Sequence, residues 1–168
     1  SPVCTIDWCD RPVVEGLVCA HCSARLERAL GDIPALTEEL DNVLTKQARY
    51  ADAEGRGGSE KALPFSPAAS ELGWVLRNTL ATWCRLIGEE RGKELPGNDT
   101  PAAMARWLLS HVEWLRHHRA GAEAVEEITS VVKQIRKAID RPAERIYAGP
   151  CRDCGGDMFG KPGAVSVE

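Results

Sequence analysis

The 168-residue sequence contains no long uncharged run of apolar residues, and this absence argues against a membrane-spanning helix. Its opening residues form neither the basic segment nor the apolar core of a secretory signal peptide, so we expect a cytoplasmic protein. An excess of basic charge is also missing, because the sequence has 21 Lys and Arg residues against 25 Asp and Glu residues, which gives a formal net charge of −4. That balance argues against a protein that coats nucleic acid by bulk charge alone.

The usual local signatures of enzymes are missing as well. The sequence has no glycine-rich phosphate loop, no internal repeat, and no Ser/His/Asp arrangement or carboxylate pair with a recognisable spacing. Its composition, 43% hydrophobic and 27% charged, is that of an ordinary globular protein. We therefore expect a globular protein that is not an enzyme.

Cysteine, in contrast, is abundant. The seven cysteines are an odd number and the chain has no secretory signal, so a disulfide framework is the weaker interpretation. The spacing Cys4-x4-Cys9-x9-Cys19-x2-Cys22 is typical of a tetrahedral four-thiolate zinc site. Such a site is coordinatively closed, which makes it structural rather than catalytic. The full set is Cys4, Cys9, Cys19, Cys22, Cys84, Cys151 and Cys154.

The residues around the second cysteine pair favour a small zinc finger over residues 1–33. Cys19 and Cys22 directly precede a predicted helix over residues 23–30, whose exposed N–H groups and positive dipole end favour thiolates. Residues 13–18 can supply a short hairpin strand before it, as in treble-clef or ribbon-type fingers. His21 could replace one cysteine, but four thiolates suffice and we expect its ring to face solvent.

A second cysteine pair indicates a partial zinc ribbon over residues 142–168. Cys151 and Cys154 form a knuckle motif between two predicted strands, but a ribbon needs another pair about 15–20 residues further on. Only 14 residues follow Cys154, so we interpret the chain as truncated inside an incomplete second zinc site. The alternative is a natural end whose pair is idle or shared between subunits. His117 and His118 are poor candidates to complete it, because adjacent helical side chains point about 100° apart.

Helical periodicity dominates residues 34–141, so the fold class is mainly α, a helical bundle flanked by the two cysteine modules. A stretch over residues 51–64 loses this periodicity and is predicted to be a linker or mobile loop. On the apolar stripes, His111 and Cys84 are expected to be core residues rather than ligands. The expected helices cover residues 34–50, Pro67 to about Gly92, Pro101 to about His118, and 122–139.

Two small basic groups are the candidate nucleic-acid contacts. Arg25 and Arg28 lie near the predicted finger helix, and Arg116 and Arg119 flank two histidines at a predicted helix end. Without an overall basic excess, these residues predict weak or absent binding of duplex DNA.

The two cysteine-rich ends and the helical middle together resemble cysteine-rich proteins of actinobacteria and their phages. The similarity rests on Cys4-Thr5-Ile6-Asp7-Trp8-Cys9, on Val18-Cys19-Ala20-His21-Cys22, and on the segment from Tyr147 to Asp157. It implies an N-terminal zinc finger and a zinc ribbon, and longer members continue into a helix-turn-helix DNA-binding domain that this sequence lacks.

The implied function is that of a zinc-binding, DNA-associated regulatory protein of phage or prophage type in the cytoplasm of a bacterial host cell. This chain would be its non-reading N-terminal fragment, with DNA as a partner of the full-length protein. The alternative is a zinc-stabilised adaptor that docks a protein or forms a homodimer through the bundle, and the net charge of −4 favours it.

Overall fold

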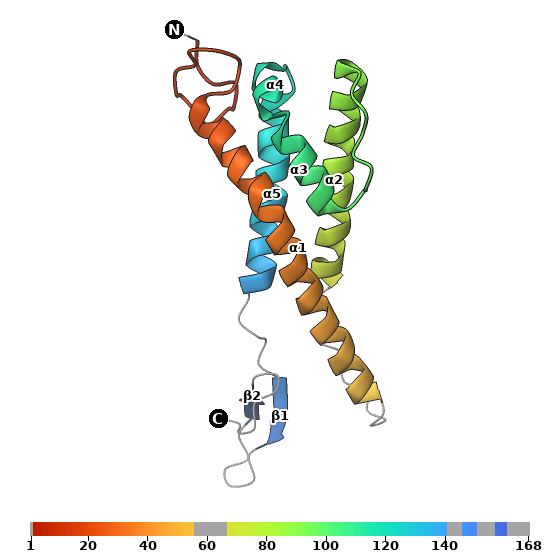
Figure 1. Ribbon diagram of the computed structural model, residues 1–168. Coiled ribbons are helices and arrows are strands. Elements are labelled where there is room, and N and C mark those ends of the chain that lie inside the picture. The colour runs from red at the N-terminus through yellow and green to blue at the C-terminus, as the bar shows by residue number, and fades with distance from the viewer. Residues whose placement is uncertain (1, 56–66, 141–145, 151–156, 161–168) are drawn as a thin grey trace.

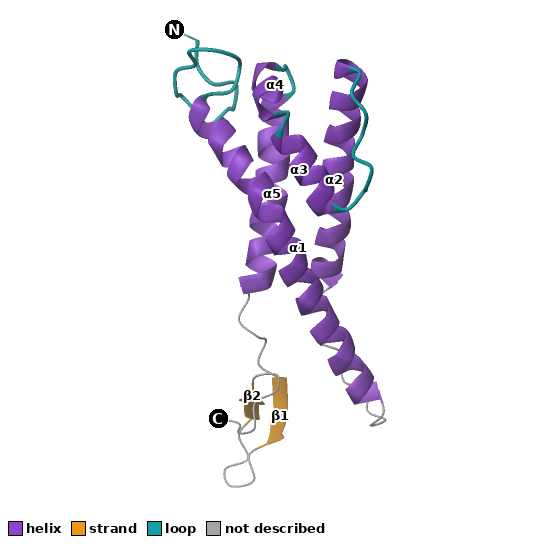
Figure 2. Cartoon of the chain, in the orientation of Figure 1, coloured by secondary structure: helices purple, strands orange, loops and turns teal. Residues whose placement is uncertain are grey.

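The computed structural model describes residues 2–55, 67–140, 146–150 and 157–160, and its architecture there is mainly helical (Figures 1 and 2). No helix in these residues is long and apolar enough to cross a membrane. The elements are α1 (Ala20–Gly55), α2 (Pro67–Arg91), α3 (Pro101–Leu109), α4 (Val112–His117), α5 (Gly121–Asp140), β1 (Ile146–Pro150) and β2 (Asp157–Gly160).

The longest element, α1, merges two helices that we expected to be separate. It runs without interruption over 36 residues and contains Pro34, which normally ends a helix because it lacks an N–H donor. Buried apolar residues continue on both sides of the proline, from Leu30 and Ile33 to Leu40, so tertiary packing outweighs the local cost. The boundary that we placed after residue 33 thus falls inside one helix. The expected linker over residues 51–64 is wrong in its first part, since α1 continues to Gly55, and its remainder lies outside the described residues.

The other helices follow the predicted stop and start signals with one exception. Gly92, at a φ of 62°, ends α2, and the Thr100 side chain accepts a hydrogen bond from the Ala103 amide at the start of α3. The single helix expected from Pro101 to His118 is wrong. It divides into α3 and α4 at Ser110 and His111, where the His111 backbone has φ −112° and ψ 4°.

The four longer helices enclose one core. Both α1 and α2 pack against α3 and α5, and Figure 1 shows α1 crossing the bundle obliquely. Polar contacts at the rim join the same elements, because Arg136 of α5 pairs with Asp32 of α1 and Trp83 of α2 donates to Glu127 of α5. The largest fully buried side chains include Leu26, Leu30, Ile33, Leu76, Leu80, Ile87, Leu108, Leu115, Ile128 and Ile135.

Residues 2–19, named here the N-terminal loop, contain no β-strand. The expected hairpin strand over residues 13–18 is wrong, and the ladder contact of this segment is an isolated bridge between Val3 and Pro12. The physical reason lies at its end, where the amides of Leu17 and Val18 donate to a carbonyl at the C-terminal end of α4 instead of to a neighbouring strand.

Two short antiparallel strands lie near the C-terminus of the chain. β1 pairs with β2 from Ile146↔Gly160 to Pro150↔Asp157, with an irregularity between Tyr147 and Gly149. Cys151 and Cys154 lie outside the described residues, so the zinc ribbon and its incomplete site stay predictions.

Candidate metal centre

The N-terminal loop and the first turn of α1 bring four cysteines together. The Cys4 amide donates to the Arg11 carbonyl at 2.9 Å, and the Cys9 amide donates to the Ile6 carbonyl at 2.9 Å. Cys19 directly precedes α1 and Cys22 lies in its first turn. Local backbone hydrogen bonds therefore position both cysteine pairs of the predicted quartet.

The four sulfur atoms of the quartet lie close enough together to surround one metal ion. All four lie within 4.8 Å of one another. The sulfur atom of Cys9 is 3.8 Å from that of Cys19 and 3.6 Å from that of Cys22. Sulfur atoms bound at about 2.3 Å to a common metal ion occupy tetrahedron corners that are about 3.8 Å apart. None of the four forms a disulfide, which would require about 2.05 Å.

The quartet is buried, and the pKa values of its thiols differ. Each of the four cysteines is at most 5% exposed. Burial raises the pKa of the Cys4 and Cys22 thiols, and the neighbouring thiols of Cys19 and Cys9 raise that of Cys22 further. Burial acts in the same direction on Cys19, but the Cys22 amide and the adjacent thiols donate to its sulfur and lower its pKa to about 7. The Cys19 thiol is therefore more acidic than the thiols of Cys4 and Cys22.

Backbone amides also contact the quartet from the start of α1. The Cys19 amide donates to the Cys4 sulfur at 3.3 Å, and the Cys22 amide donates to the Cys19 sulfur at 3.5 Å. These are the free N–H groups of a helix N-terminus, which favour negative charge. The arrangement suits four thiolates around a dication.

The N-terminal loop is not a separate body but rests on the bundle. Ile6, Val13 and Val18 are at most 5% exposed and belong to the same apolar cluster as the helix core. An added Cβ on Gly121, at the start of α5, would overlap the Leu115 carbonyl and lie 3.3 Å from Val18. Glycine is thus required by the tight α4–α5 turn itself, and Val18 of the loop packs against the same position.

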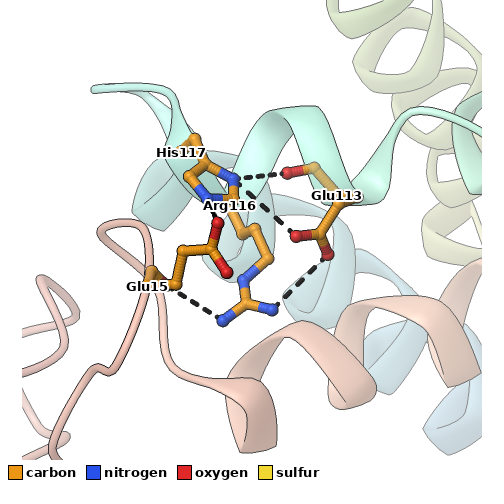
Figure 3. A network of polar contacts seen from close by, with 4 residues as sticks. All are labelled: Glu15, Glu113, Arg116 and His117. Atoms are coloured by element: carbon orange, nitrogen blue, oxygen red, sulfur yellow. Dashed lines mark hydrogen bonds and ion pairs between the residues drawn. The ribbon is translucent and has the colours of Figure 1, made fainter.

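Polar contacts fasten the same loop to α4, as Figure 3 shows for four of the residues involved. The Leu17 and Val18 amides donate to the Arg116 carbonyl at 2.8 and 3.1 Å, and the Arg116 guanidinium donates to the Glu15 carbonyl at 3.0 Å. The guanidinium also contacts the Glu113 carboxylate at 3.4 Å, and the His117 ring lies 3.7 Å from the Glu15 carboxylate. The sequence did not predict this junction between the N-terminal loop and α4. The local feature that marks it is Gly16, whose φ in the structure is 86°.

The structure separates the four arginines that were candidate nucleic-acid contacts. Arg116 is engaged by the N-terminal loop, with its side chain 18% exposed, whereas Arg28 and Arg119 are exposed. Arg25 is half-buried, and its guanidinium carbon lies 4.8 Å from the centre of the Trp8 ring. His21 is exposed, as expected, and its pKa is lowered chiefly by the charge of Arg11.

The remaining histidine and cysteine candidates have internal roles. His111 is 8% exposed and Cys84 is 3% exposed, as expected for core residues, and burial raises the pKa of the Cys84 thiol to about 11. His118 contacts the Glu90 carboxylate at 2.6 Å, so its ring already has a partner on α2. Within the described residues, the quartet is the one group of three or more Cys, His, Asp or Glu side chains placed to hold a metal ion.

No family model matches the chain, and the comparisons with curated proteins and with solved structures found no similar protein. The function is therefore argued from the geometry of the site.

Proposed function

We propose that Cys4, Cys9, Cys19 and Cys22 hold one structural zinc ion, and that the protein is a zinc-stabilised binding protein rather than an enzyme. The observation that carries this proposal is the clustering of four buried sulfur atoms within 4.8 Å of one another, two of whose separations, 3.8 and 3.6 Å, are close to the edge of a zinc tetrathiolate. A bound zinc ion would crosslink the N-terminal loop to the start of α1. Four protein ligands leave no open coordination position for a substrate, which supports a structural role.

The experiment compares two cysteine substitutions by metal analysis of the purified protein. Cys22→Ser removes one ligand, so we expect zinc to fall from about one ion per chain to near zero. Cys84→Ala is the matched control, because Cys84 is also buried but lies on α2 outside the quartet. It should keep its zinc while losing about 1 kcal/mol of stability. A folded wild-type protein free of metal, one containing iron instead, or a Cys4–Cys9 disulfide would contradict the proposal.

Two biological roles fit this centre. A DNA-associated regulatory role follows from the resemblance to cysteine-rich phage proteins and is supported by His21, Arg25 and Arg28, which are four and three residues apart on α1. An adaptor role that binds another protein is supported by the net charge of −4 and by exposed apolar side chains on the N-terminal loop, Val3 at 56% and Val14 at 102%. Binding to nucleic acid through the α1 residues distinguishes the two.

A further inference from the structure

Trp8 is a large apolar side chain that the fold leaves in water. It is 56% exposed, although its neighbour Cys9 is 5% exposed. The guanidinium carbon of Arg25 lies 4.8 Å from the centre of the Trp8 ring. Burying an indole of this size is strongly favourable, so Trp8, with its cation partner and its place beside the quartet, is a candidate contact for a ligand.

Several cations lie on the loop and the helix that adjoin this indole. His21, Arg25 and Arg28 follow one face of α1, and the first turn of that helix contains no acidic residue. Arg11 is exposed on the N-terminal loop, and its carbonyl accepts a hydrogen bond from the amide of the quartet residue Cys4 at 2.9 Å. A flat aromatic ring with Arg25 against it, and with Arg11 and Arg28 on the same loop and helix, thus lies beside the quartet.

We propose that Trp8, Arg11, Arg25 and Arg28 form a binding site for single-stranded nucleic acid. An unpaired base stacks on the open face of the Trp8 indole, and the three guanidinium groups contact the adjacent phosphates. The inference rests on the proposed zinc centre, because the ligands Cys9 and Cys22 adjoin Trp8 and the α1 cations and fix them relative to each other.

Single strands fit this surface better than a duplex or an acidic protein. In a duplex the base faces are stacked on one another and cannot reach an indole, whereas a single strand exposes them. An acidic peptide pairs with the arginines but offers no flat ring to Trp8. The exposed carboxylates of Asp7 and Asp10 on the same loop limit the footprint to a few nucleotides.

The test is fluorescence anisotropy with a labelled decamer of deoxythymidine, using protein whose zinc content has first been measured. We expect binding in low salt with a logarithmic salt slope of about −2, the value for roughly three phosphates on a single strand. Trp8→Ala and Arg28→Glu should each weaken binding about tenfold. The matched controls are Trp74→Ala, which removes a tryptophan that is 68% exposed on α2, and Arg85→Glu, which reverses an exposed charge on the same helix.

Each outcome decides. Unchanged binding in the two controls, with losses in the two site variants, supports the inference. Three results with zinc-loaded protein would overturn the inference and leave the zinc proposal standing. They are no binding of the decamer, equal binding of polyglutamate or duplex DNA, and a loss of affinity in Trp74→Ala as large as in Trp8→Ala. A folded wild-type protein without zinc overturns the zinc proposal first.

Discussion

His111 shows how one buried side chain can make this fold sensitive to acid. Its ring packs on Trp107, with centroids 4.1 Å apart, and its Nδ1 atom accepts a hydrogen bond from the Arg91 guanidinium at 2.8 Å. A guanidinium only donates, so Nδ1 must be unprotonated. A second proton on this ring would place two cations in contact at the α3–α4 junction.

We predict that His111→Gln flattens the loss of stability between pH 7.5 and 5.5. Burial lowers the pKa of His111, and the charges of Arg91 and Lys93 lower it further. The folded pKa therefore lies below the unfolded value of about 6.5. The stabilisation by neutral His111 is complete above that value and is lost as the pH falls through the folded pKa.

Urea unfolding followed by circular dichroism, in wild type and variant across this range, measures the effect. Acid also weakens zinc binding, but that contribution is common to both proteins and cancels in the difference. Parallel pH profiles for the two proteins would show that His111 does not titrate with folding.

Among the elements, the N-terminal loop meets α4 through a glycine whose conformation matters. Gly16 has a φ of 86°, and a Cβ placed there would lie 3.0 Å from the Arg116 carbonyl oxygen, the same atom that accepts from Leu17 and Val18. A side chain at this position conflicts with both the backbone conformation and the contact.

Gly16→Ala is therefore predicted to lower the free energy of unfolding by about 1–2 kcal/mol, the usual cost of a positive φ for an L-residue. Gly31→Ala is the matched control, because Gly31 lies inside α1 with nothing within 4 Å of an added Cβ. That change should stabilise the protein by about 0.5–1 kcal/mol. The denaturant midpoints of the two variants measure both changes in stability. Equal midpoints would show that the positive φ of Gly16 and its contact with Arg116 do not restrict this position.

The same elements show which parts of the fold can be predicted from local sequence. The α5 helix follows from its apolar stripe and from Asp140-Arg141-Pro142, which predicts its end, and the cysteine quartet follows from ligand spacing alone. The continuity of α1 through Pro34 cannot be predicted in this way, because packing against distant core residues outweighs a strong local stop signal. The break at His111 has no glycine or proline nearby, and its partner Arg91 lies on another helix. Likewise, no local sequence pattern predicts that Arg116 contacts the N-terminal loop.

At the scale of the whole molecule, the N-terminal loop and the bundle share one apolar core. Buried residues extend continuously from Cys4 and Ile6 in the loop to Ile135 in α5. Metal binding and the packing of α4 are therefore expected to be thermodynamically coupled, because the segment 15–18 lies between the quartet and Arg116.

Removing the proposed zinc ion with a strong chelator should thus increase amide hydrogen exchange together in two segments that are far apart in the sequence, residues 2–19 and residues 112–121. The first loses its crosslink, and the second loses its contacts with Glu15, Leu17 and Val18. The centres of α2 and α5 should keep their protection, since their core contacts lie away from the loop. Exchange that rises in residues 2–19 alone would show that the loop and α4 are independent.

The separation of Glu15 from Arg116 by 101 positions also orders events during synthesis of the chain. At about 5–20 residues per second, a ribosome that has finished the quartet needs about 5–20 s more to reach α4. During that interval the nascent loop has its own ligands but not its docking surface. Uptake of the proposed zinc ion can therefore precede assembly of the bundle, and the later helices would then close against a loop that the metal has already shaped.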